Sequence, residues 1–176
     1  VGDEQIQFAA FYLANRDSCL RAVIGCVGDR ELAEDLVAEA FARAWTSWRK
    51  VSRYEAPKAW VVRTALNTGT SWWRRRRREV PLGAHDAAAA ADPHDGVDVT
   101  LIAAVRRLST RQREVIALRV FLDLDTETTA AALGIAPGTV TAHLSRAVTA
   151  LRRDVAPPPN QAPAACHEPI HMEVAP

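Results

Sequence analysis

The stretch of this sequence most suited to binding a polyanion is a pair of tryptophans followed by five arginines. Trp72 and Trp73 stand directly before Arg74, Arg75 and Arg76, and the run ends at residue 78. Guanidinium groups bind phosphate through charge and paired hydrogen bonds. If the run neutralises three phosphates, the log–log dependence of affinity on salt steepens by about 3. We expect it to contact a nucleic-acid backbone, the alternative being a solvated basic helix end.

A second candidate is the helix-turn-helix pattern of residues 130–140, AAALGIAPGTV. This motif needs a small residue where two helices cross, a glycine with a left-handed backbone, and an apolar residue after it. Ala131, Gly134 and Ile135 meet these needs in order. The second helix would enter the major groove of DNA, unless the hairpin is only two packed helices. The expected DNA contacts are Pro137, Gly138, Thr139, Thr141, Arg146 and His143, the last suited equally to phosphate.

Helices should position these segments. Apolar residues recur at three- and four-residue steps, with Ile6, Trp45 and Val120 among them, which predicts an all-α fold. Gly28 and Asp29 should end one helix and cap the next. The expected helices cover residues 5–27, 30–48, 58–76, 99–108, 126–133 and 137–153, with another capped by a box of Ser109 and Gln112.

Composition divides the chain into two small helical domains. Residues 81–98 hold four Asp, an alanine run and no Lys or Arg, so residues 79–98 are predicted to be a flexible acidic linker. The domains would cover residues 1–78 and 99–155, the second containing the helix-turn-helix. Residues 156–176 are rich in proline and are expected to be disordered.

Several classes of protein are not supported by the sequence. The three cysteines lack CxxC spacing and suit free thiols in a reducing compartment. Neither a secretion signal nor a membrane-length apolar run occurs, which favours the cytoplasm. No phosphate-binding loop or catalytic triad motif is present, so neither an enzyme nor a cofactor is expected. Cys166, His167 and His171 could hold a metal, but a flexible tail disfavours this and we expect no metal site.

Both halves of the chain resemble extracytoplasmic-function (ECF) RNA polymerase sigma factors. Residues 108–115 (LSTRQREV) and 133–147 (LGIAPGTVTAHLSRA) resemble the fourth conserved region of that family. Residues 28–45 (GDRELAEDLVAEAFARAW) and 57–67 (PKAWVVRTALN) resemble its second conserved region. The resemblance covers roughly residues 4–155 and is strongest to the SigE-like subgroup.

The resemblance implies a surface for docking on core RNA polymerase. In the family, the helix at residues 30–48 docks on the clamp helices of the largest polymerase subunit. An acidic, partly apolar face suits a basic partner, although composition alone would equally allow a solvated face. The implied contacts are Glu34, Asp35, Leu36, Glu39 and Phe41.

The resemblance also implies two promoter contacts. The fourth region reads the −35 element, and the helix after Pro57 handles the −10 element. There an aromatic ring stacks on an exposed base, which is worth roughly 1–3 kcal/mol, and an Asn bonds a flipped one. Trp60 matches the aromatic position but would equally suit the core. The implied −10 contacts are Trp60, Arg63, Asn67, Trp72, Trp73, Arg74, Arg75 and Arg76.

We therefore predict a transcription initiation factor whose partners are core RNA polymerase, promoter DNA and an anti-sigma factor. Ala136 stands where family members often have a capping Ser or Thr, which could cost about 1 kcal/mol. Thr141 and Ala142 replace basic residues, so −35 reading is expected to be weak. The alternatives are a LuxR-type regulator without polymerase docking and an anti-sigma decoy that binds polymerase but not DNA.

Overall fold

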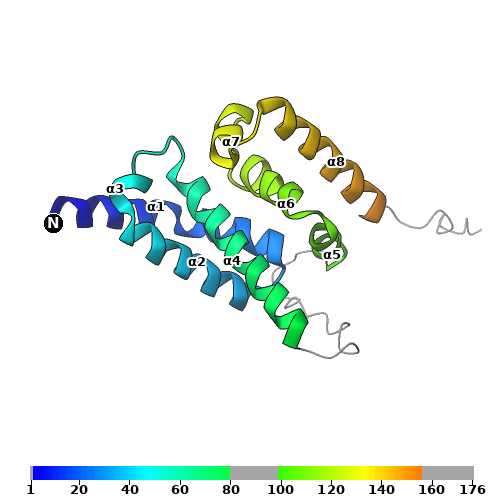
Figure 1. The fold of residues 1–176 in the computed structure, drawn as a ribbon, viewed down its shortest axis with the longest axis horizontal. Helices are drawn as coiled ribbons and strands as arrows, with labels where there is room; N and C mark the ends of the chain where they lie inside the picture. Colours follow the sequence, from blue (N-terminus) through cyan, green and yellow to red (C-terminus); the bar gives the residue numbers. More distant parts are fainter. Residues whose placement is uncertain (1, 80–98, 156–176) are drawn as a thin grey trace, which may run out of the picture.

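The computed structural model describes residues 2–79 and 99–155, and every element in these two ranges is helical (Figure 1). The all-α prediction is therefore confirmed there. The predicted linker and tail lie outside the described residues. The elements are α1 (Gly2–Val27), α2 (Arg30–Thr46), α3 (Trp48–Val51), α4 (Pro57–Glu79), α5 (Val99–Arg107), α6 (Thr110–Ile116), the π-helix η2 (Ala117–Phe121), α7 (Thr126–Leu133) and α8 (Pro137–Val155).

The N-terminal helical unit is built from α1, α2 and α4, which pack on one another. Gly28 ends α1 with φ of 66°, and the Asp29 carboxylate caps α2 by accepting from the Leu32 amide at 3.0 Å. A Cβ at Gly69 would lie 2.9 Å from Cδ1 of Leu36, so this glycine lets α2 and α4 approach closely. The predicted stop and cap between the first two helices are confirmed.

Aromatic rings fill one end of this unit. The Phe11 ring centroid lies 5.0 Å from that of Trp48 and 5.8 Å from that of Phe41. The Phe8 and Trp48 rings meet edge to face at 5.2 Å. Such pairs add about 0.5–1.5 kcal/mol each beyond the area they bury. These ring contacts hold α1, α2 and α3 together.

The C-terminal helical unit comprises α5, α6, η2, α7 and α8. Its last helix, α8, packs on α5, α6 and α7. The predicted capping box is confirmed: the Gln112 amide donates to Ser109 Oγ at 3.3 Å, and the Ser109 amide donates to Gln112 Oε1 at 3.0 Å. A small apolar cluster of Val105, Leu108, Ile116 and Ala147 lies within the unit.

The two helical units share one continuous core, because α1 packs against both η2 and α5. Leu118 of η2 is 1% exposed and belongs to the same buried cluster as Val23 and Val62. The main contact lies at the C-terminal end of α1, beside the C-terminal helices in Figure 1. The sequence predicted two domains but did not predict that they pack together.

Three positions predicted to face the core are exposed. Ile6 is 70% exposed near the start of α1, and Trp45 is 41% exposed beside the Phe8 ring. Val120 is 59% exposed because η2 is a π-helix, whose wider turn breaks the 3.6-residue period. The helix expected at residues 30–48 also ends earlier, at Thr46, and α3 begins at Trp48.

We predict that Leu118→Ala lowers the free energy of unfolding by about 2–5 kcal/mol, because it leaves a cavity in the shared core. Urea denaturation followed by circular dichroism measures this change. The matched control is Val120→Ala on the same element, which should change stability by under about 0.5 kcal/mol. Equal effects of the two substitutions would contradict a shared core at Leu118.

Candidate nucleic-acid interface

The turn between α7 and α8 has the geometry of a helix-turn-helix. Gly134 ends α7 in the left-handed conformation, with φ of 65° and ψ of 41°. Its amide donates to the carbonyl oxygens of Ala130 and Ala131, and the Ile135 amide donates to Ala130 O at 3.1 Å. This pattern satisfies the free carbonyls at the helix end and redirects the chain. The predicted role of Gly134 is confirmed.

The small residue buried in this hairpin differs from the expected one. Ala130 is 4% exposed and belongs to the core, whereas Ala131 is exposed. Sequence spacing placed Ala131 at the crossing. The prediction was wrong by one position, because the face of α7 that packs on the core holds Thr129, Ala130 and Leu133.

The side of α8 that faces solvent carries most of the residues predicted to contact DNA. Val140 and Ala147 are fully buried and seat the helix on its neighbours. Ala136 precedes α8, and its methyl group offers no acceptor to the first amides. Of the predicted contacts, His143 is half-buried, and those exposed are Pro137, Gly138, Thr139, Thr141 and Arg146.

The first helix of the hairpin is capped by a carboxylate. Asp125 accepts from the Thr128 amide at 2.7 Å and from Thr128 Oγ1 at 3.0 Å. These hydrogen bonds lower the pKa of Asp125. An ionised cap at the start of α7 also suits the positive end of the helix dipole.

The candidate residues of α4 follow one another at helical spacing but differ in exposure. Trp60 is half-buried against the core, which supports a packing role for part of its ring. Arg63 is half-buried and donates from NH1 to the carbonyl of Ala132 at 2.7 Å. Asn67 is exposed. The side chains of the predicted contacts Trp72, Trp73, Arg74, Arg75 and Arg76 lie outside those that the structure describes, although α4 continues to Glu79.

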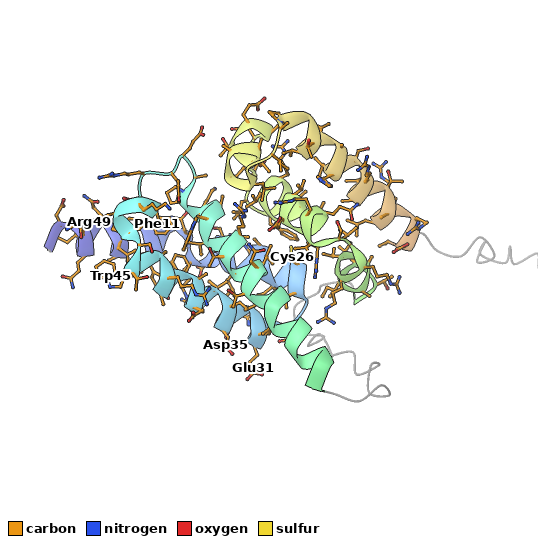
Figure 2. The ribbon with its side chains drawn as sticks, in the orientation of Figure 1. Phe11, Cys26, Glu31, Asp35, Trp45 and Arg49 are labelled. Carbon is orange, nitrogen blue, oxygen red and sulfur yellow. The ribbon has the colours of Figure 1, made fainter. Side chains whose placement is uncertain are left out.

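An acidic face runs along α2, where Figure 2 labels Glu31 and Asp35. The predicted contacts Glu34, Asp35 and Glu39 are exposed. Glu34 pairs with the Arg30 Nε at 3.1 Å and Glu39 with the Arg43 Nε at 2.7 Å, both within the helix. The other two predicted contacts, Leu36 and Phe41, are 5% and 3% exposed, so they anchor α2 in the core and do not form its outer face.

Exposed aromatic and basic side chains lie together along the chain at the end of α3 and in the loop before α4. The sequence analysis did not identify them as a candidate site. Tyr54 is 40% exposed, and Lys50 and Arg53 near it are also exposed. Arg49, labelled in Figure 2, donates to Glu4 of α1 at 2.7 Å. An exposed ring among basic side chains suits an unpaired base and its phosphate. The signal available in the sequence was the run Arg-Lys-Val-Ser-Arg-Tyr at residues 49–54.

A buried carboxylate lies on α6, a helix that contacts both α8 and α4. Glu114 is 4% exposed and accepts from Arg111 NH1 at 2.8 Å. Burial raises the pKa of Glu114, and the charges of Arg111 and Arg63 lower it in part. Arg63 thus acts on the pKa of this carboxylate through its charge, while its hydrogen bond goes to the α7 carbonyl of Ala132.

Both cysteines of the described residues lie in the core, on α1. Cys19 and Cys26 are buried free thiols, and burial raises the pKa of each to about 12. Within residues 2–79 and 99–155, no cluster of His, Cys, Asp and Glu suited to a metal occurs. The same ranges hold no helix long and apolar enough to cross a membrane. The tail group of Cys166, His167 and His171 lies outside them.

Comparison with protein families gives two matches in chain order. The family described as Sigma-70 region 2 matches residues 11–79, and Sigma-70, region 4 matches residues 98–151. The first match includes α2 and α4, and the second includes the helix-turn-helix. A region 2 match does not favour a LuxR-type regulator, the alternative considered for the C-terminal half alone.

Similar proteins cover nearly the same length. An RNA polymerase sigma-E factor of Streptomyces antibioticus is 35% identical over 155 residues, which cover 86% of each chain. The sigma-E factor of Streptomyces coelicolor is 34% identical over 157 residues, covering 86% of this chain and 88% of that one. A solved structure of the sigma factor RpoE with the anti-sigma factor NepR from Bartonella quintana has a TM-score of 0.65 at 26% identity, covering 84% of this chain and 96% of that one.

We predict that Glu114→Gln raises the melting temperature at neutral pH. The pKa of Glu114 in the folded state is raised above its ordinary value of 4.5. At a pH above 4.5, ionisation of this carboxyl group therefore opposes folding. The amide of glutamine removes this cost and keeps an oxygen acceptor for Arg111. The advantage should shrink as the pH falls towards 4.5. Differential scanning calorimetry at several pH values measures it. A variant less stable than wild type at neutral pH would contradict the assigned cause.

Proposed function

Because the chain belongs to the ECF group of sigma-70 RNA polymerase sigma factors, we propose that α2 docks core polymerase, α4 contacts the −10 element and α8 contacts the −35 element. As a sigma factor, the protein binds core RNA polymerase, directs it to specific promoters and assists promoter melting.

The observation that carries the −35 assignment is the exposed start of α8. Gly134 sets the angle of the hairpin, and Val140 holds α8 on its neighbours, so Thr139 and Thr141 remain in solvent. The free amides of a helix start attract phosphate, which places the first turns in the major groove. Thr139 and Thr141 offer short hydroxyl contacts and Arg146 a charged one, which supports positioning by phosphate more than strong base reading.

For polymerase docking, the acidic outer face of α2 is the surface we favour. The carboxylates of Glu34 and Glu39 are partly neutralised by arginines one turn away. Asp35 lies between them on the exposed side. A basic partner would compete with these intrahelical pairs, which are exposed and weak. Leu36 and Phe41 would contribute by fixing the orientation of this face.

For the −10 element, we propose that Asn67 bonds an unpaired base and that the following arginines bind the backbone. Asn67 is exposed, and an amide can pair with a base edge. Trp60 and Arg63 extend the same contact along α4, and the group around Tyr54 supplies a further stacking surface. No catalytic group is required, because melting is driven by binding the separated strand.

We divide the chain at residues 1–78 and 99–155 into a docking and −10 unit and a −35 unit, joined by residues 79–98 and followed by a tail from residue 156. The protein would act in the cytoplasm, where polymerase and chromosome are found. The solved RpoE relative was determined with an anti-sigma factor, and we propose a partner of that class for this chain.

Runoff transcription on a promoter library with Streptomyces coelicolor core polymerase tests the proposal. We expect specific transcripts with wild type and about tenfold less open complex with Asn67→Ala, since a lost base contact costs about 1–3 kcal/mol. Asn67→Ala should still bind core polymerase normally. The control is Gln5→Ala, an exposed amide on α1. Transcription that is equal with both variants would remove Asn67 from the site, and the absence of any specific transcript would overturn the function.

A further inference from the structure

An apolar strip runs along the outer face of α1. The most exposed large apolar side chains of the described residues are Leu13, at 78%, and Ile6, at 70%. They are separated by nearly two helical turns, so they lie on the same side of the helix. Ala10 and Ala14 on this side are also exposed. We call these four residues the α1 strip. Single exposed apolar residues are ordinary, but a row of them along one helix is typical of a contact surface.

Opposite charges lie towards the two ends of the α1 strip. Asp3 and Arg21 are both exposed. Their separation of 18 residues makes five full turns, which places them on the same side of α1 about 27 Å apart. Glu4 is already paired with Arg49 at 2.7 Å. Asp3 instead accepts a hydrogen bond from the neutral amide of Gln7 at 2.9 Å, so its charge stays available to a cation.

This pattern is self-complementary when a second α1 runs antiparallel to the first. With Asp3 opposite Arg21 of the second copy, the midpoint of the helix pair falls between Ala10 and Ala14. Small side chains at this point let two helices approach closely. Leu13 then packs on the alanines of the second copy, and a two-fold axis generates each contact twice. A parallel pair would instead bring the two aspartates together at one end and the two arginines at the other.

The other residues on this face fit the same arrangement. Ile6 lies near Leu20 of the second copy, which is half-buried. Asp17, the other exposed acid on this side, lies opposite Gln7 of the second copy, whose amide can donate to it. No like charges are placed directly opposite each other. In Figure 1 the first turns of α1 lie at the end of the molecule farthest from α5 and α8.

We propose that the chain forms a two-fold dimer in which the α1 strip packs antiparallel on that of a second copy. Apolar contact through Leu13 and Ile6 supplies most of the affinity. The pairs of Asp3 with Arg21 set the orientation, because exposed ion pairs are individually weak but exclude the wrong alignment. The strip is narrow, so the dimer forms at high protein concentration and dissociates on dilution. It uses neither the acidic face of α2 nor the start of α8.

Sedimentation equilibrium of the full chain over a range of concentrations tests the dimer. Wild type should move from the mass of one chain, 19.2 kDa, towards twice that mass as the concentration rises. Leu13→Ala removes two leucines from each dimer and should raise the dissociation constant about tenfold. Its circular dichroism should match wild type, because the site is exposed and alanine favours helix. The control is Leu101→Ala, which truncates a leucine of α5 that is 40% exposed and should leave the constant unchanged.

Charge reversal tests the antiparallel orientation. Asp3→Arg or Arg21→Asp alone places like charges opposite each other at both ends of the helix pair. Each should raise the dissociation constant about threefold at low salt. The two substitutions combined in one chain should restore the wild-type constant, since opposite charges face each other again.

A chain that keeps the mass of one copy at every concentration would overturn the dimer. Equal weakening by Leu13→Ala and Leu101→Ala would overturn the α1 contact, and no recovery in the double reversal would overturn its orientation. If the free chain is monomeric and Leu13→Ala instead weakens binding of core polymerase, the α1 strip belongs to polymerase and the dimer is excluded. Sedimentation of the free chain uses neither DNA nor polymerase, so its outcome is independent of the runoff assay.

Discussion

The close approach of α1 to η2 and α5 is the contact on which the rest of the arrangement depends. Two glycines at the end of α1 leave room for Phe121 and Ile102, where any larger side chain would collide with them. This approach brings Leu118 into the core and sets the C-terminal helices beside α4. The hydrogen bonds of Lys58 and Arg63 to carbonyls of the other unit then follow from the packing.

The contact of α1 with η2 and α5 also relates the helix-turn-helix to the exposed face of α4. The helix-turn-helix is built from local rules, with Asp125 capping its first helix and Gly134 turning the chain. The position of that motif relative to α4 depends instead on contacts between residues far apart in sequence, such as Gly28 and Ile102. Local geometry therefore determines the shape of the helix-turn-helix, and long-range packing determines where it lies relative to α4.

Sequence patterns were most informative where the physics is local. The cap at Asp29, the box at Ser109 and the left-handed Gly134 each depend on a few neighbouring residues, and all three predictions are confirmed. Val120 was misjudged because a π-helix interrupts the helical period. Burial of Leu36 and Phe41 and the engagement of Arg63 with Ala132 depend on the assembled fold, which periodicity cannot encode.

The two helical units pack on each other through one shared core, and a measurement of the distance between them tests this packing most directly. Fluorescence energy transfer between dyes at residues 38 on α2 and 149 on α8, both exposed, measures that distance in the full chain. High transfer in the free protein is the predicted result, because α1 and α4 pack against the C-terminal helices. Low transfer in the free protein would contradict it.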